Sequence, residues 1–471
     1  MKLSKNKLPL ELSLHKHYED NVKGVYNNCH PKVKDARKAS MMLLKNSGLP
    51  LANNEKWRNT NLGEFYKNSY LIGDEKPVFD KQINEIFSCV VHGFNTNVFA
   101  LLNGWYYSSE EEQIQTLADG IIVGSINAAQ KKYPELISKY FNELVTDDQH
   151  GLNAANGAIF TDGIFIYVPD NVESDKAIQL IKMVNRDSST MINSRNLIIL
   201  GKNSKLSFLH CDDSINQHHG FLVTNTEIFL DENAKLDLYK LQNLNDNTTI
   251  VNSTFANQKQ NSELKVNVLT FNGGTIRNEF DIELAGKGAH ADVSGIYLMD
   301  NKQHVDNQLL IKHLAPNCTS NQMFKGVLDD KASGVFKGSV YVAKDAQQTV
   351  AFQKNANILM TSEASIDTMP FLEIYADDVK CSHGATVGQL DSEAMFYLMQ
   401  RGISKSDARL LLMYAFTSEV TSKIGIEALQ TNIDDMIKKR LRGDLSICDK
   451  CVLHCSTPDT PIIFDIDMSK I

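Results

Sequence analysis

From about Phe160 onward, apolar residues recur at the two-residue spacing that places them on one face of a β-strand. The predicted strands are separated by turns of one pattern, in which Gly, Asn, Asp or Glu is followed by Ala or Ser and then by an apolar residue. Four such turns lie at 200–206, 230–236, 284–291 and 360–366. A repeated strand–turn–strand unit is typical of a β-solenoid, in which each coil buries its apolar side against the next coil.

The spacing of these turns is uneven. Thirty residues separate Leu206 from Leu236, whereas 55 residues separate Leu236 from Ala291. The pattern of apolar residues is therefore also compatible with a β-sandwich or an irregular sheet.

The first 145 residues follow mainly a helical period. Residues 33–44 have the spacing of an amphipathic helix that Gly48 and Pro50 would end, and 127–144 form a second such run. A short strand is predicted at 97–107. Trp57 is expected to anchor a packed turn, and we assign it no chemistry. The chain is thus divided into a mainly helical N-terminal domain at 1–145, a β-helix core at 146–388, a helical domain at 389–445 and a cysteine-containing tail at 446–471.

One stretch joins a predicted strand to a predicted helix, and it carries the first candidate chemistry. Residues 373–380 alternate, so a strand is predicted through His383. Cys381 and His383 would share a face of that strand because they are two residues apart. A thiolate beside an imidazole is half of an iron or zinc site and needs further ligands from elsewhere. The alternative is a buried thiol and a hydrogen-bonded histidine.

Two helices are predicted directly after this strand. Asp391 can cap the first helix, and Gly402 would end it. Ser404 can cap the second, in which an apolar run covers 410–416. Helices joined by so short a link form an antiparallel pair, whose apolar faces serve either core packing or the docking of a partner.

The C-terminal tail contains a second cluster of potential metal ligands. Cys448 and Cys451 have C-x-x-C spacing, and His454 and Cys455 follow closely. Four such groups within eight residues are able to bind zinc or hold iron transiently, although structural zinc sites usually spread two ligand pairs further apart. The alternative is a reduced tail without metal.

Composition excludes several classes of protein. With 42% hydrophobic and 22% charged residues the chain is of the ordinary globular type, and its net charge of −9 argues against a general nucleic-acid binder. Eight dispersed cysteines suit reduced thiols, and no long apolar run predicts a membrane span, so we expect a soluble cytoplasmic protein. The phosphate-loop, G-x-S-x-G and H-E-x-x-H motifs are absent, so neither nucleotide binding nor independent catalysis is expected.

His304 and Asp306 share a predicted strand face, most simply as a hydrogen-bonded structural pair.

Several long strings in the chain resemble a known family. DDVKCSHGATVGQLD at 377–391, followed by FYLMQRGIS at 396–404 and LLLMYAFTSEV at 410–420, closely resembles the SufB/SufD family of iron–sulfur cluster assembly proteins, in its SufD branch. The resemblance extends to the segments at 55–62, 160–169, 295–308 and 317–342. It therefore covers most of the chain.

This resemblance implies a fold and a role. Proteins of this kind have a right-handed parallel β-helix flanked by helical domains, and they act as non-catalytic scaffold subunits. A SufD-like chain pairs with SufB, a β-helix paralogue, and each of the two engages one copy of SufC, an ABC-type ATPase. Cys381 and His383 match the family's CSHGATVG motif at the SufB–SufD interface, where they would receive iron or hold a nascent iron–sulfur cluster together with ligands from the partner.

The resemblance also implies a docking surface for the ATPase at 389–420. The residues expected to contact a partner there are Leu390, Met395, Tyr397, Leu398, Arg401, Leu411, Tyr414 and Phe416. The sequence does not decide whether the chain forms a homodimer in the absence of SufB.

Three other functions are weighed against this one. Within the family, the alternative is a SufB-type paralogue, which the composition of the CSHGATVG segment disfavours. A carbohydrate-active β-helix enzyme would need a groove of acids and aromatic residues, yet the chain has only 2 Trp residues. A metal-storing or metal-sensing protein would use Cys448, Cys451 and Cys455.

Overall fold

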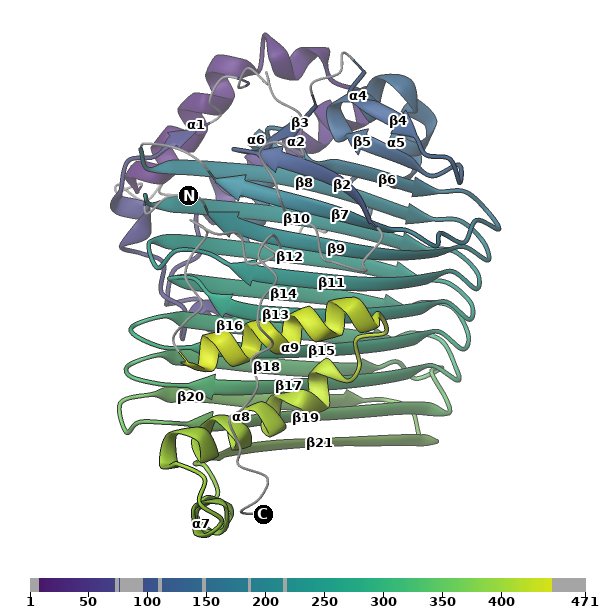
Figure 1. Ribbon diagram of the computed structural model, residues 1–471. Coiled ribbons are helices and arrows are strands. Elements are labelled where there is room, and N and C mark those ends of the chain that lie inside the picture. The colour runs from purple at the N-terminus through teal and green to yellow at the C-terminus, as the bar shows by residue number, and fades with distance from the viewer. Residues whose placement is uncertain are drawn as a thin grey trace.

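The computed structural model describes residues 8–72, 76, 96–108, 112–145, 150–184, 188–214 and 218–442. Its centre is a parallel β-helix of about seven turns (Figure 1). The strands of the β-helix are β6 (Ile164–Val168), β7 (Ala177–Val184), β8 (Thr190–Leu200), β9 (Lys205–Ser214), β10 (Gly220–Leu230), β11 (Lys235–Asn243), β12 (Thr248–Gln258), β13 (Glu263–Asn272), β14 (Thr275–Leu284), β15 (His290–Met299), β16 (His304–His313), β17 (Thr319–Leu328), β18 (Ser333–Val342), β19 (Thr349–Leu359), β20 (Ser365–Ile374) and β21 (Val379–Gly388).

Successive strands alternate between two sheets that face each other across the core. The even-numbered strands from β6 to β20 form one sheet, here called sheet A, and the odd-numbered strands from β7 to β21 form sheet B. Each strand therefore pairs with the strand one full turn away, in parallel. The solenoid predicted from the sequence is confirmed.

Asparagines at one corner of the β-helix explain how the chain turns there. Asn203, Asn233 and Asn261 have φ angles of 56°, 57° and 54°, the left-handed region that asparagine tolerates better than most residues. Asn233 Nδ2 donates to Asn203 Oδ1 at 2.8 Å, across one turn of 30 residues. Stacked corners of this kind keep the strands in register.

The uneven turn spacing seen in the sequence has a simple structural cause. Leu236 pairs with Leu264, and Leu264 pairs with Ala291, so the 55-residue interval is two turns of the β-helix. The intermediate corner has the same pattern, with Asn261 followed by Ser262 and then by Leu264, and the sequence prediction missed this turn. The interior beneath these corners is apolar, and burying each large aliphatic or aromatic side chain contributes roughly 1.5–3 kcal/mol.

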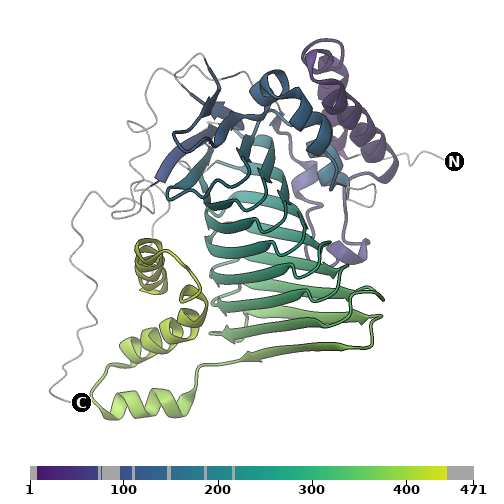
Figure 2. The same ribbon diagram turned by 90° about the vertical axis from the view of Figure 1, so that its right-hand side faces the viewer.

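The N-terminal region combines helices and strands at one end of the β-helix (Figure 2). The helices are α1 (Pro9–Asn21), η1 (Val25–Asn28), α2 (Pro31–Ser47), η2 (Glu55–Trp57), η3 (Phe65–Lys67), α4 (Ile126–Lys132), α5 (Pro134–Tyr140) and α6 (Gly151–Ile159), and the strands are β1 (Leu71–Ile72), β2 (Thr96–Leu102), β3 (Trp105–Tyr107), β4 (Ile114–Thr116) and β5 (Ile122–Ser125). Helix α2 ends at Gly48 with φ 67°, as predicted.

Two N-terminal predictions need correction. The run at 97–107 is an antiparallel hairpin of β2 and β3, and β2 extends sheet B by pairing with β7. The run at 127–144 is two helices, because Pro134 cannot continue α4 and instead begins α5.

Three helices follow the β-helix: α7 (Ser392–Gln400), α8 (Lys405–Thr421) and α9 (Glu427–Arg442). The Asp391 side chain accepts hydrogen bonds from the backbone N–H groups of residues 393 and 394, and Ser404 caps α8, both as predicted. Helices α8 and α9 lie along the outer face of sheet B (Figure 1). Leu429, Ile433 and Ile437 of α9 are fully buried there. Among the described helices, none is both long and apolar enough to cross a membrane.

Candidate functional site

The candidate ligands Cys381 and His383 lie on β21, the last strand of the β-helix. The prediction of one strand from residue 373 through His383 is wrong. Strand β20 ends at Ile374 in sheet A, the chain turns, and β21 begins at Val379 in sheet B. Residue types alternate on both sides of the corner because β20 and β21 each have an inward and an outward face.

The register of β21 places both candidate ligands toward the interior of the β-helix. Cys381 pairs with Ala351 and His383 pairs with Gln353, and these two neighbours on β19 are both buried. No described strand covers β21 from the other side, so His383 is exposed and Cys381 is half-buried. The ligands therefore share a face, as their spacing implies, and that face is open at the end of the β-helix.

Cys381 contacts apolar side chains of the chain itself, whereas His383 is exposed. The thiol packs against a small apolar cluster that includes Val342 and Ala351. Burial raises the pKa of the Cys381 thiol, and a backbone hydrogen bond from Ala351 opposes this only in part. Since the thiolate is the form that binds metal, a metal ion or a partner's cation is needed to ionise Cys381 at neutral pH.

Cys381 and His383 alone would be an incomplete metal site. Within the part of the chain that the structure describes, no group of three or more His, Cys, Asp or Glu side chains is arranged to hold a metal ion. The tail candidates Cys448, Cys451, His454 and Cys455 lie outside the described residues. A soft thiolate with an imidazole suits iron, but the remaining ligands must come from another source.

Among the described residues, no strand pairs with the outer edges of β20 and β21, and apolar side chains are exposed there. β20 and β21 are the terminal strands of their sheets. Phe371 and Tyr375 are 54% and 56% exposed, and Val387 on β21 is 47% exposed. An open edge of this kind is a ready template for pairing with another chain.

Helix α7 is a second exposed surface. It buries none of its residues, and it projects beyond the last turn of the β-helix (Figure 2). Of the predicted partner residues, Tyr397 is exposed and its hydroxyl accepts a hydrogen bond from the Arg401 guanidinium at 2.6 Å. The sequence prediction missed Phe396, the most exposed aromatic residue of this helix, and Met399. The sequence feature that indicates these two residues is the run of four apolar residues at 396–399. Such a run covers more of a helix surface than one buried stripe does.

The other predicted partner residues are partly engaged within the chain. Leu390, Tyr414 and Phe416 are half-buried and pack against the cluster between α8, α9 and sheet B. Lys325 Nζ donates to the Phe416 carbonyl oxygen at 2.7 Å and lies 4.5 Å from the centre of its ring. Met395, Leu398 and Leu411 are also half-buried. These side chains hold the helices in place and leave only part of their surface to a partner.

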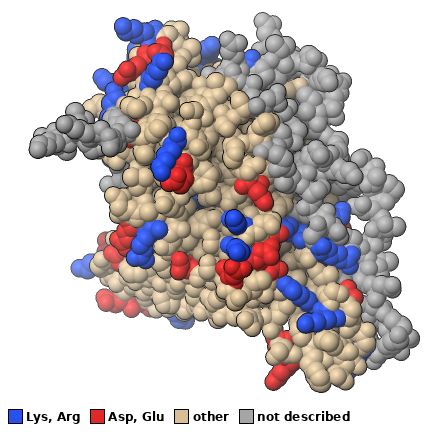
Figure 3. Space-filling view, turned by 90° about the vertical axis from the view of Figure 1, so that its left-hand side faces the viewer, with Lys and Arg blue, Asp and Glu red and all other residues tan. Residues whose placement is uncertain are grey.

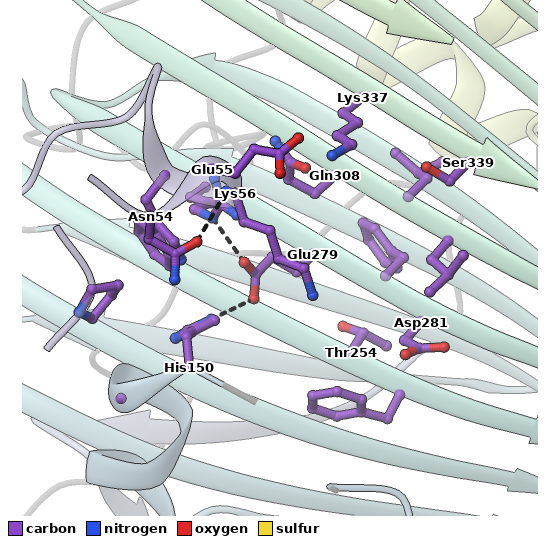
Figure 4. A pocket seen from close by; sticks show the side chains of 18 of the residues that line it. Asn54, Glu55, Lys56, His150, Thr254, Glu279, Asp281, Gln308, Lys337 and Ser339 are labelled. Carbon is purple, nitrogen blue, oxygen red and sulfur yellow. Dashed lines mark hydrogen bonds and ion pairs between the residues drawn. The ribbon is translucent and has the colours of Figure 1, made fainter. Parts of the chain in front are cut away.

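A cleft of about 500 Å³ lies between the outer face of sheet A and the segment around Trp57, with polar and apolar side chains in its lining (Figure 4). Glu279 accepts from Arg277 Nε at 2.8 Å and lies 2.7 Å from His150 Nε2, and these partners hold the pKa of its carboxyl well below the usual range. Trp57 is fully buried beneath the Arg277 guanidinium, at 3.9 Å. Glu279 is thus held ionised, whereas burial raises the pKa of Asp281, another acid of the lining, and Trp57 is not open to a ligand.

The pair His304 and Asp306 belongs to the same buried network. Thr60 Oγ1 lies 3.0 Å from His304 Nε2 and also donates to Asp306, which pairs with Arg277. The network ties the segment around Trp57 to sheet A. His304 and Asp306 are thus structural, as expected, but Thr60 links them. The expectation that Trp57 anchors a packed turn is confirmed.

Charged side chains form no basic stripe on the face that Figure 3 shows. Lys and Arg stand next to Asp and Glu over the described part of that face. A nucleic-acid binder would gather its cations along one surface.

Comparison with known proteins identifies the family. The model for "SUF system FeS cluster assembly, SufBD core domain" matches residues 183–416, and the model for "SufBD protein N-terminal region" matches residues 9–180. The chain belongs to the SufBD family. Within this family, a SufBD protein of Synechocystis is 27% identical over 413 residues, which are 86% of this chain and 90% of that protein.

Two further SufBD relatives carry the name SufD. SufD of Bacillus subtilis is 27% identical over 332 residues, 70% of this chain and 76% of that protein. SufD of Escherichia coli is 38% identical over 171 residues, 36% of this chain and 40% of that protein. The family prediction, with its SufD branch, is confirmed, and the general role of the chain is in iron–sulfur cluster assembly by the SUF system. The matched core domain includes β20, β21 and α7.

Proposed function

We propose that this SufBD protein is a SufD-like scaffold subunit without catalytic activity of its own. It pairs with a SufB-like β-helix paralogue through β20 and β21 and contributes Cys381 and His383 to an iron site shared across that interface. The observation that supports this most directly is the position of both residues on the inward face of an exposed terminal strand. A second β-helix stacked on this end would cover the apolar side chains and bring the missing ligands.

In this proposal iron is the cargo of the site. Cys381 as thiolate and His383 as neutral imidazole bind the incoming iron or the nascent cluster, and a partner supplies the other ligands. A partner's cation or the iron itself lowers the pKa of the thiol that burial raises. The cluster rests there only until it is handed on.

The second part of the proposal concerns α7 and α8. Their exposed side chains dock a SufC-like ABC-type ATPase, which binds and hydrolyses the nucleotide, while this chain binds none. Closure of two such ATPase subunits pulls on the helices and shifts the paired β-helices, so that the site at β21 opens to iron or sulfur. The complex acts in the cytoplasm, without nucleic acid or membrane as a partner.

The alternative functions have weaker support. A SufB-type paralogue shares the fold, but two of the relatives described above are named SufD. A carbohydrate-active enzyme would use acids of the cleft on sheet A, where Glu279 is held ionised by Arg277 and His150 and Asp281 is paired with Lys312. The tail cysteines Cys448, Cys451 and Cys455 stay a separate candidate for metal storage, tested by truncation after Gly443.

The test is co-expression with the host's SufB-like and SufC-like proteins, followed by anaerobic purification. We expect His383→Ala to assemble the same complex with a several-fold loss of bound iron and of the cluster's visible absorbance. Ser382→Ala is the matched control, because Ser382 lies on the same strand and its side chain faces the other side. An unchanged cluster in His383→Ala would show that Cys381 and His383 are structural, and the tail cysteines would then be the next candidates to test.

A further inference from the structure

The inward column of sheet B changes from apolar to polar as it approaches His383. Its last four members, one turn apart, are Val293, Gln322, Gln353 and His383. Val293 and Gln322 are completely buried, and Gln353 is 4% exposed. Two glutamine side chains therefore lie in the interior of the β-helix directly below the candidate iron ligand.

The two carboxamides satisfy each other only in part. Gln353 Nε2 donates to Gln322 Oε1 at 2.9 Å. Gln353 Oε1 and Gln322 Nε2 are buried and have no hydrogen-bond partner among the described residues. A buried acceptor without a partner is unfavourable, so we expect such an atom to bind a ligand or to gain a partner in a second conformation of its neighbours.

The opposite sheet leaves room for this arrangement. A Cβ atom at Gly338 of β18 would lie 1.4 Å from Gln353 Nε2 and 2.9 Å from Gln322 Oε1. Any side chain at Gly338 would displace the Gln353 carboxamide. The space that glycine leaves here is therefore occupied by the glutamine pair.

Parallel neighbours on one face of a sheet lie about 4.8 Å apart, which brings a histidine ring within reach of a glutamine one strand away. A metal-binding histidine almost always donates its second ring N–H to an oxygen, which fixes the ring and its tautomer. Gln353 Oε1 is an acceptor of that kind, adjacent in register to His383.

We propose that Gln353 is the positioning residue for His383: its Oε1 accepts the N–H of one ring nitrogen and leaves the other nitrogen to bind iron. This inference rests on the proposed function, because it assumes that His383 binds iron. It adds that the ligand is held from inside the β-helix, by a ladder in which Gln322 orients Gln353 and Gln353 orients His383.

The experiment compares substitutions in the complex purified with the SufB-like and SufC-like partners, loaded anaerobically with Fe²⁺. Gln353→Met and Gln322→Met both remove the hydrogen bond between the glutamines, but only Gln353→Met removes the free acceptor. We expect Gln353→Met to weaken iron binding ~10–100-fold and to move the loss of iron on acidification to higher pH. Gln322→Met should weaken iron binding less than Gln353→Met, because it leaves the acceptor in place, and Gln353→Glu, which keeps an acceptor, should retain iron.

Each outcome decides a different point. Equal iron loss in Gln353→Met and Gln322→Met would show that the ladder is only structural and would overturn the inference. Iron loss in His383→Ala without any in Gln353→Met would overturn the inference and leave the proposed function standing. No iron loss in His383→Ala would contradict the proposed function itself. Should Gln353→Met fail to assemble, Gly338→Ala displaces the same carboxamide without removing it, and unchanged iron retention there would also reject the inference.

Discussion

At the scale of single residues, the interior of this β-helix contains polar groups whose ionisation is set by burial. His313 at the end of β16 is fully buried, and its Nε2 lies 2.8 Å from Ser320 Oγ. Its Nδ1 has no hydrogen-bond partner among the described residues. Burial lowers the pKa of His313 to about 4. The neutral imidazole is thus part of the folded core, and its protonation opposes folding.

The pH dependence of stability follows from this pKa. Between pH 6.5 and about 4, the unfolded chain binds a proton at His313 that the folded chain does not, so the free energy of unfolding falls as the pH is lowered through that window. We expect a loss of roughly 2 kcal/mol from this residue between pH 7 and pH 5. Urea unfolding at both pH values should show a smaller loss for His313→Gln than for the unsubstituted chain. The exposed His219, substituted as His219→Gln, is the control, and an equal loss in both variants would refute the assignment.

At the scale of elements, the three C-terminal helices differ in what covers them. Helix α9 buries Leu429, Ile433 and Ile437 against sheet B, and α8 lies beside it. Helix α7 exposes Phe396 and Met399 and buries nothing. The apolar surface of α7 therefore contributes little to the stability of the isolated chain and is available to a partner.

A double substitution on α7 separates docking from folding. Phe396→Ser with Met399→Ser should change the free energy of unfolding by no more than ~0.5 kcal/mol, because both side chains are exposed. The same variant should lose co-purification with the SufC-like ATPase. Ile433→Ala on α9 is the buried counterpart and should cost about 2–5 kcal/mol. Retained ATPase binding in the α7 variant would remove this helix from the proposed interface.

At the scale of the whole molecule, the two ends of the β-helix are unlike. The N-terminal helices and strands cover one end, whereas β20 and β21 leave the other end open (Figure 2). Terminal repeats of a solenoid need a cap, because each coil is stabilised by burial against the next. The open end predicts that the chain binds a second β-helix, and that it binds a copy of itself when the SufB-like partner is missing.

Sedimentation velocity of the isolated chain tests this expectation. We expect a concentration-dependent dimer that Val387→Lys converts to monomer, because a lysine at this position of β21 would place a charge within the paired edge. Leu12→Lys is the control, since Leu12 on α1 is exposed to a similar extent at 54% but lies away from β21. A monomer at every concentration, or a dimer that survives Val387→Lys, would show that this edge does not self-associate.

The sequence alone determined the features that depend on near neighbours. The strand period, the caps at Asp391 and Ser404, and the shared face of Cys381 and His383 all follow from sterics and hydrogen bonds within a few residues. Only the tertiary structure decided that a corner separates β20 from β21, that α7 is uncovered, and that Gln353 lies beneath His383. These features depend on which residues meet after a turn of about 30 residues, and on which strand is the last, and no local pattern contains that information.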